Sequence, residues 1–226
     1  MTRAHVAFDD VSYEVDGVPI LTGVTTALAA RRTAVIGANG SGKSTFARMI
    51  NGLRQPTSGA VRVLGLDPAA EATRVRSRVG FVFTNPEAQI LMPTPAEDLA
   101  LSLASVPRAM RAERVERILE EYGLAGRGDQ RVSELSGGQR QLLALAAVLC
   151  TEPQLVVADE PTTLLDLRNA RRIADLLLTL AAPVVIVTHD LELAARCDEA
   201  VLFDGGRLVA EGEPRGVIET YRWVSS

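Results

Sequence analysis

The 226-residue sequence has little cysteine, and the placement of that cysteine excludes a disulfide framework. The two cysteines are Cys150 and Cys197, and neither belongs to a C-x-x-C pair of the kind that binds metals or exchanges disulfides. We therefore expect two buried thiols in a protein of a reducing compartment.

Long apolar runs are also missing, which argues against a membrane span. The most apolar stretch, 173–188, is interrupted by Asp175 and Pro183 and falls short of the roughly 20 apolar residues that a helix needs to cross a bilayer. The N-terminus has no apolar signal-peptide region. These absences predict a soluble or peripheral protein on the cytoplasmic side of the membrane.

Lysine is nearly absent, and the positive charge is carried almost entirely by arginine. The net charge is −4 and no basic tract is present, so charge gives no reason to expect nucleic acid or an anionic membrane surface as a partner. Among the 24 basic residues, Lys43 is the only lysine. Because an ammonium group and a planar guanidinium are not interchangeable, we expect the chemistry at this position to require lysine.

Strand and helix patterns alternate along the chain. Residues 4–28 predict antiparallel strands with a turn at Asp16-Gly17, and a second hairpin is expected over 201–209. Other strands are expected near 33–36, 61–64, 80–83, 155–158 and 184–187, and helices near 43–51, 96–105, 108–122, 137–150, 167–181 and from 191.

This order predicts an α/β fold with a mainly parallel sheet covered on both faces. An antiparallel β-subdomain is expected at the N-terminus. We expect a single domain over 1–226, in which a helical subdomain of approximately 94–150 is inserted into a core formed by 1–93 and 151–226.

A glycine-rich loop after strand 33–36 matches the pattern G-x-x-x-x-G-K-[ST] of a phosphate-binding loop. Its glycines let the backbone wrap around phosphates, and the following helix adds its positive N-terminus. We expect Lys43 at the β and γ phosphates, Ser44 at Mg²⁺ and Thr45 near the α phosphate. The candidate nucleotide-binding residues of this loop are Gly37, Ala38, Asn39, Gly40, Ser41, Gly42, Lys43, Ser44 and Thr45.

An acidic pair, Asp159 and Glu160, follows the apolar strand 155–158. The C-terminal ends of strands are where α/β sheets place their ligands. We expect Asp159 to hold the Mg²⁺ shell and Glu160 to polarise a water for attack on the γ phosphate. Because the pair follows a phosphate loop, we favour these roles over ordinary helix capping.

The segment Leu135-Ser-Gly-Gly-Gln139 is the most specific motif in the chain. Ser136 and two glycines ahead of helix 139–150 form a second anion site at a helix N-terminus. A capping box between Ser136 and Gln139 would also explain the start of the helix. It would not explain why a second anion site should exist. The candidate residues are Ser136, Gly137, Gly138 and Gln139.

With these motifs in this order, the sequence resembles the ATP-binding-cassette (ABC) family over nearly its whole length. The resemblance implies a P-loop NTPase core that binds ATP and Mg²⁺ and hydrolyses the ATP. It also implies a dimer with itself or with a paralogous subunit, in which segment 136–139 of one subunit closes over the γ phosphate bound by the other. Three further positions match family markers. Tyr13 matches the aromatic residue that stacks on adenine, Asp166 the loop that crosses the dimer interface, and His189 the catalytic histidine that senses the γ phosphate.

One position departs from the family pattern. Thr84 stands where relatives carry a glutamine that links Mg²⁺ and the attacking water to the membrane partner. Its hydroxyl can still meet Mg²⁺ or a water, although its reach is shorter by roughly two bonds. We expect Thr84 to lower hydrolysis without abolishing it, and Gln89 is not assumed to replace the missing amide.

The stretch 85–103 resembles a segment of energy-coupling-factor importers, which take up vitamins and transition-metal ions. The resemblance implies an integral-membrane scaffold and a substrate-binding membrane subunit as partners. The candidate docking residues are Gln89, Ile90, Leu91 and Met92. The last three either form an apolar patch for a partner helix or begin the core of the helical insertion, and the sequence leaves both alternatives open.

The chain ends soon after the hairpin 201–209, as in the biotin importer type, so biotin is the first expectation for the cargo. Two other functions remain open. One is the ATPase of a conventional importer or an exporter, and the other is a soluble cassette outside transport.

Overall fold

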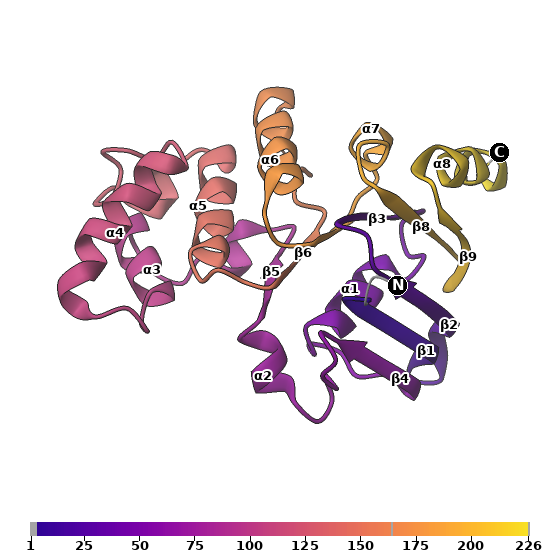
Figure 1. Ribbon diagram of the computed structural model, residues 1–226. Coiled ribbons are helices and arrows are strands. Elements are labelled where there is room, and N and C mark those ends of the chain that lie inside the picture. The colour runs from indigo at the N-terminus through magenta and orange to yellow at the C-terminus, as the bar shows by residue number, and fades with distance from the viewer. Residues whose placement is uncertain (1–3, 164, 226) are drawn as a thin grey trace.

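The computed structural model describes residues 4–163 and 165–225, which form two β-sheets with helices packed around them (Figure 1). The smaller sheet is antiparallel with the order β2-β1-β4. Asp16 and Gly17 both have positive φ, which is the backbone conformation that a tight hairpin turn requires, so the predicted turn is confirmed. The strands are β1 (Val6–Val15), β2 (Val18–Leu28) and β4 (Ser58–Val63).

The larger sheet has six strands in the order β5-β6-β7-β3-β8-β9. All neighbouring strands from β5 to β8 are parallel, and β9 returns antiparallel to β8 as the second predicted hairpin. The strands are β3 (Arg32–Gly37), β5 (Val79–Val82), β6 (Leu155–Asp159), β7 (Val184–Val187), β8 (Glu199–Asp204) and β9 (Arg207–Gly212).

The parallel strands lie between two hydrophobic cores. Because side chains alternate along a strand, Val35 faces one core while Ala34 and Ile36 face the other. The first core lies between the two sheets around α1 (Lys43–Ile50), where Phe46 stacks on Phe8 with ring centroids 4.3 Å apart.

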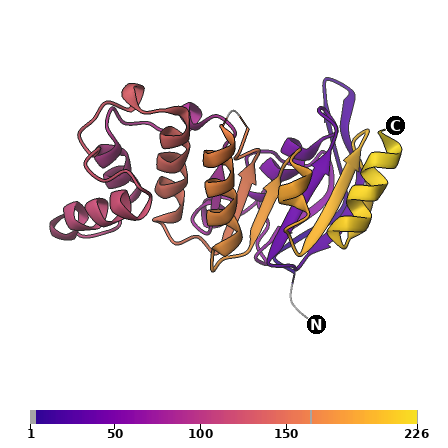
Figure 2. The ribbon, with the colours of Figure 1, turned by 90° about the horizontal axis from the view of Figure 1, so that it is seen from above.

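The second core is covered by a row of helices that Figure 2 shows from above. These helices are α5 (Gly137–Leu149), α6 (Leu167–Thr179), α7 (Leu191–Ala194) and α8 (Pro214–Val224). The yellow helix α8 closes one end of the row (Figures 1 and 2).

The helices of the expected insertion lie at the opposite end of the molecule from α8 (Figure 1). They are α3 (Pro95–Ser102) and α4 (Arg108–Glu121), packed with α5, and the 3-10 turns η1 (Pro86–Ala88) and η2 (Val132–Glu134) flank them. Buried Leu99 and Leu119 join them to the second core. The division of the chain near 94 and 150 stays a prediction, because this region shares its hydrophobic core with the parallel sheet.

Two helices were not predicted from the sequence. They are the short α2 (Ala72–Arg76) and the C-terminal α8, which begins at a Glu213 cap and buries Val217 and Ile218. Over residues 4–163 and 165–225, no helix combines the length and apolarity that crossing a membrane demands.

Candidate functional site

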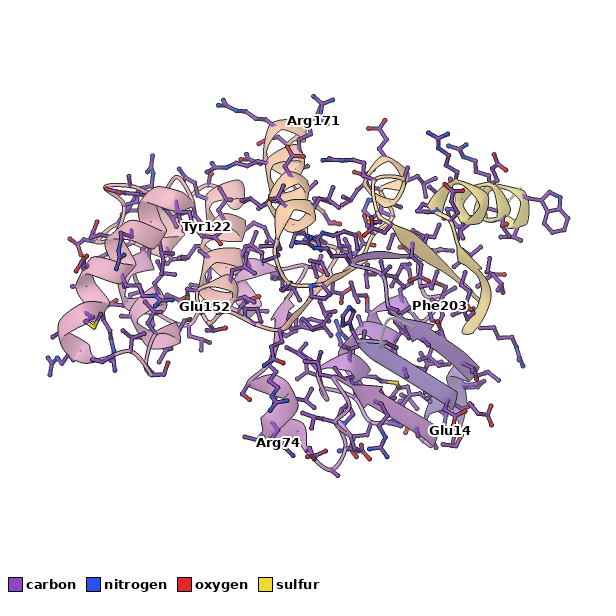
Figure 3. All side chains as sticks on the ribbon, in the orientation of Figure 1. Glu14, Arg74, Tyr122, Glu152, Arg171 and Phe203 are labelled. Atoms are coloured by element: carbon purple, nitrogen blue, oxygen red, sulfur yellow. The ribbon has the colours of Figure 1, made fainter. Side chains whose placement is uncertain are left out.

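The glycine-rich loop leaves the C-terminal end of β3, in the middle of the parallel sheet, and leads into α1. Its first residue, Gly37, has a φ of 143°, and a Cβ atom there would lie 2.1 Å from the carbonyl oxygen of Phe203 on β8. Figure 3 labels Phe203 between the two sheets. Only glycine fits at this position, so the neighbouring strand fixes where the loop begins.

Lys43 is directed into the loop. It is 6% exposed, and its Nζ donates hydrogen bonds of 2.8 Å to the carbonyl oxygens of Gly37 and Ala38. Burial lowers the pKa of the Lys43 ammonium, and the nearby carboxylates of Glu160 and Asp159 oppose that shift. The loop therefore holds a desolvated cation at its centre, which suits an anionic ligand.

Ser41 is the loop residue whose hydrogen bonding is incomplete. Within the described parts of the chain, its hydroxyl is the only fully buried side-chain polar atom that lacks a partner. A buried hydroxyl without a partner is destabilising unless a ligand completes it. The loop is therefore built for a bound phosphate group, and its geometry fits a nucleotide.

Asp159, at the end of β6, is 1% exposed and lies beside α1. Its Oδ1 accepts a 2.9 Å hydrogen bond from Ser44, and Arg48 approaches Oδ2 to 3.7 Å. Burial raises the pKa of the Asp159 carboxyl, and the bond from Ser44 opposes the rise. A carboxylate and a hydroxyl in contact supply the hard oxygen ligands that Mg²⁺ prefers, so the predicted pair fits the ion.

Thr84 lies next to this pair. Its hydroxyl donates a 2.8 Å hydrogen bond to the main-chain carbonyl oxygen of Asp159. The bond ties the end of β5 to the end of β6 and uses the hydroxyl hydrogen. The lone pairs of the Thr84 oxygen remain available to a water or a cation.

Glu160 and His189 meet in a cavity of about 430 Å³ at the same edge of the sheet. Glu160 Oε2 lies 2.7 Å from His189 Nδ1 and accepts a 3.0 Å hydrogen bond from Thr163. The backbone of Glu160 is left-handed, with a φ of 53°. Such strain in a non-glycine residue persists only where the surroundings fix it, and it is common at functional sites. Gly37, Ala38, Asn39, Glu160, Thr163, His189 and Tyr221 line the cavity.

Two of these lining residues, Thr163 and Tyr221, were not among the predicted site residues. Thr163 lies three residues before Asp166, the residue that matches the dimer-interface loop, and Leu164 between them is outside the described residues. Tyr221 belongs to α8, a helix that was not predicted from the sequence.

The segment 136–139 forms the start of α5. Ser136 and Gln139 make the reciprocal hydrogen bonds of a capping box, so the capping interpretation holds. Ser136 and Gly137 are also exposed, so the start of α5 is accessible to a ligand from another molecule. Both interpretations are therefore compatible with the structure.

The start of α5 packs against the start of α6. A Cβ on Gly138 would lie 2.5 Å from Cγ of Asn169, so the Asn169 side chain would have to move if this residue were not glycine. Asp166 caps α6 by accepting hydrogen bonds from the backbone and side chain of Asn169, and these bonds lower the pKa of Asp166. Segment 136–139 and the loop at Asp166 thus both contact the side chain of Asn169.

Tyr13 lies half-buried on β1 and packs partly against the first core. The guanidinium carbon of Arg54 lies 6.0 Å from the centre of its ring. Within the described residues, Tyr13 does not line the cavity at Glu160. Its contact with adenine stays a prediction.

The candidate docking residues divide into two groups. Gln89 is held inside the fold, because its side chain accepts a hydrogen bond from Phe83 N–H at 3.2 Å and donates one to the Ala144 carbonyl at 2.9 Å. Ile90 packs against the second core, whereas Leu91 is 73% exposed.

The buried carboxylate of Asp98 accepts hydrogen bonds from the backbone N–H groups of Leu91 and Met92. These bonds fix the path of the segment in a way that its sequence did not predict.

A family model described as ABC transporter matches residues 24–163, more than half of the chain. The chain belongs to the ABC transporter family. It is an ABC-type ATPase, and its α/β fold, with a mainly parallel sheet and an N-terminal antiparallel sheet, confirms the predicted fold class.

Relatives match this cassette over most of its length. A putative ABC transporter ATP-binding protein of Bartonella henselae is 43% identical over 218 residues, covering 96% of each chain. A biotin transport ATP-binding protein of Rhizobium etli is 39% identical over 224 residues, covering 98% of this chain and 100% of the relative. An energy-coupling factor transporter ATP-binding protein of Bacillus subtilis is 37% identical over 193 residues, covering 82% of this chain and 69% of the relative.

Solved structures share the fold of this cassette. CbiO1 of Clostridium perfringens, part of the ABC transporter complex CbiONQ, superimposes with a TM-score of 0.84 at 26% identity, over 99% of this chain and 94% of the other. An ATP-binding cassette in a dimeric post-hydrolysis state, bound to ADP and phosphate, has a TM-score of 0.81 at 29% identity, over 93% and 99% of the two chains.

Replacing Gly37 with alanine tests the position of the loop. The new Cβ would clash with the Phe203 carbonyl, and the residue would have to keep a φ that alanine avoids. Backbone strain of about 1–3 kcal/mol is expected, and we predict that affinity for a fluorescent ATP analogue falls about tenfold or more.

Gly216→Ala is the matched control, because a Cβ there meets open space and the backbone is helical. Thermal denaturation checks that both variants fold. Unchanged affinity in folded Gly37→Ala would contradict the proposed constraint.

Proposed function

We propose that this ATPase energises a membrane importer of the energy-coupling-factor type, with biotin as the first candidate cargo and other vitamins or a transition-metal ion as alternatives. The observation that carries the proposal is the 39% identity with the Rhizobium etli biotin transport ATP-binding protein, which extends over all of that relative. The identity with the energy-coupling factor ATP-binding protein of Bacillus subtilis supports the importer type.

The proposed partners are an integral-membrane scaffold and a substrate-binding membrane subunit, with this chain bound peripherally at the cytoplasmic face of the membrane. The exposed Leu91 offers the scaffold an apolar contact, next to backbone fixed by Asp98. Thr84 and Gln89 connect this region to β6 and α5, so movement at the nucleotide can reach the docking surface through two hydrogen-bonded side chains. We expect no nucleic-acid partner.

In the proposed nucleotide complex, Lys43 exchanges its two carbonyl partners for oxygens of the β and γ phosphates. Ser41 and the backbone N–H groups of the loop complete the phosphate contacts, and Tyr13 supports the adenine. Ser44 and Asp159, with Thr84 as a further candidate, would hold Mg²⁺, which when bound neutralises charge on the phosphate oxygens.

Hydrolysis is proposed to depend on the Glu160–His189 pair. Glu160 Oε2 contacts Thr163 and His189, and the carboxylate has further acceptor sites for the attacking water. The carboxylate then accepts a proton from that water, while His189 is directed toward the γ phosphate. The 14% exposure of the Glu160 side chain limits competition from bulk solvent.

The site is completed across a dimer of this chain with itself or a paralogue. The exposed start of α5 offers the Gly137 N–H and the Ser136 hydroxyl to the γ phosphate of the other subunit, while the Ser136 N–H stays in the capping box. Asp166 lies in the loop next to this surface. The dimeric ADP-bound and phosphate-bound relative supports this arrangement.

Replacing Glu160 with glutamine tests the proposed base. We predict that turnover falls by at least about 100-fold because the amide accepts no proton, while ATP binding and dimer formation persist. ATPase assays and size-exclusion chromatography with ATP measure the two properties.

Glu152→Gln is the matched control, because Glu152 also has a left-handed backbone but lies on the surface beside Arg114 (Figure 3). Near-normal turnover in Glu160→Gln would remove Glu160 from the role of base.

Replacing Thr84 with glutamine tests the departure from the family pattern. We predict that turnover rises, since the longer amide reaches the metal and the water. Thr84→Val keeps the side-chain shape but removes the hydrogen bond to the Asp159 carbonyl, so we expect its turnover to fall. Unchanged turnover in Thr84→Gln would show that this position does not limit hydrolysis.

Co-purification tests the transport role. We predict that a tagged chain, extracted from gently solubilised native membranes, brings with it a multi-span scaffold and a small integral substrate-binding protein. Leu91→Asp should reduce their recovery, whereas Val18→Asp on the antiparallel sheet, 59% exposed in the parent chain, should not.

Recovery of a conventional permease or of exporter subunits would contradict the importer type. Recovery of soluble partners alone would contradict the transport role.

A further inference from the structure

Helix α8 supplies one wall of the nucleotide cavity. The phosphate loop lines the cavity with Gly37, Ala38 and Asn39. Glu160 follows β6 and His189 follows β7, and both also line it. Tyr221 of the C-terminal helix is a further lining residue. Among the described residues, all other lining residues of this cavity lie at or before residue 189. Helix α8, which carries no recognised motif, therefore contributes to the part of the site that contains Glu160 and His189.

The packing of α8 explains how Tyr221 arrives there. Val217 and Ile218 are buried, and Tyr221 follows them at the i+4 and i+3 positions, on the same face of the helix. This face packs against β8, β9 and β3, and β3 leads directly into the phosphate loop. Tyr221 itself packs against the second core and is only partly exposed. Its ring is therefore held by the fold.

The ring of His189 requires a second contact to fix its orientation. Its side chain is 59% exposed, and its Nδ1 is held by Glu160 at 2.7 Å. One hydrogen bond fixes a ring nitrogen but leaves the ring free to tilt about that bond. His189 lies two residues before α7, and residues of α7 and α8 line the same cleft. The segment that carries His189 is therefore a neighbour of the helix that carries Tyr221.

We propose that Tyr221 is a positioning residue of the ATPase site, whose aromatic ring confines the His189 imidazole against Glu160 and toward the γ phosphate. The inference rests on the proposed role of His189 in hydrolysis. The ring acts by occupying space on the open side of the cavity, so phenylalanine would serve as well. Small errors in the position of a catalytic group are sufficient to slow a reaction by one or two orders of magnitude.

The test uses Tyr221→Ala and Tyr221→Phe in the assembly purified through a tag on this chain. We expect Tyr221→Ala to lower kcat about tenfold while KM for ATP stays within about twofold, because binding groups are untouched and only the reacting end is disordered. Tyr221→Phe should restore kcat to within about twofold of the parent. A loss in Tyr221→Phe equal to that in Tyr221→Ala would assign the effect to the hydroxyl and overturn the proposal.

Trp223→Ala is the matched control on the same helix. Trp223 is 82% exposed and does not line the cavity, so its removal should leave kcat unchanged. Thermal denaturation of each variant reports on the packing of α8. A loss of kcat in Trp223→Ala as large as in Tyr221→Ala would show that general loosening of α8 is responsible, and the proposal would fail.

A double-mutant cycle with His189→Ala separates this inference from the function on which it rests. Single-turnover assays with excess protein measure the slow variants. If Tyr221 acts through His189, Tyr221→Ala should cause no further loss in the His189→Ala background. An equal further loss there would overturn the inference. Normal turnover in His189→Ala alone would refute the proposed role of His189, whereas a slow His189→Ala with a normal Tyr221→Ala would refute only the inference.

Discussion

The register of three neighbouring parallel strands brings the phosphate loop, the acidic pair and the histidine of this protein together. In the order β6-β7-β3, Asp159 pairs with Val187, and Val35 pairs with the same residue from the other side. Backbone hydrogen bonds continue this ladder beyond the strands, from Glu160 N–H to the Val187 carbonyl and from Thr188 N–H to the Val35 carbonyl. The phosphate loop, the acidic pair and the histidine therefore leave the sheet at one edge, although they are far apart in the sequence. A shift of one strand by one residue would separate them and would also exchange the side chains that face the two cores.

Much of this arrangement could be predicted from the sequence, because local signals and the global fold agree. The turn at Asp16-Gly17 has the chemistry of a tight hairpin, and the run 155–158 is apolar at every position, as a strand buried on both faces must be. The phosphate loop is defined by residues whose spacing is fixed by the ligand. In each case the residues of a short segment are sufficient to predict its local structure.

The features that could not be predicted depend on contacts between segments that are distant in the sequence. The residues of one short segment do not indicate such contacts. Helix α8 has no motif, and only its packing on β3 and β8 brings Tyr221 to the cavity. Gln89 was assigned to a docking surface, yet its amide bridges Phe83, directly after β5, and Ala144 in α5. Thr84 was read as a shortened substitute for glutamine, and its hydrogen bond to a main-chain carbonyl on β6 could not be foreseen from the residue type. These side chains acquire their surroundings only when the sheet is assembled.

The single lysine gives the molecule an unusual chemical property. Lys43 carries the only side-chain primary amine in the chain, and it is enclosed by the loop that it stabilises. Burial also lowers its pKa, so a larger share of this amine is neutral than in an exposed lysine. An amine-selective acylating reagent therefore meets one side-chain amine, which is shielded as long as the loop stays closed. The rate of that modification reports on the opening of one loop, with no background from other side chains of the same kind.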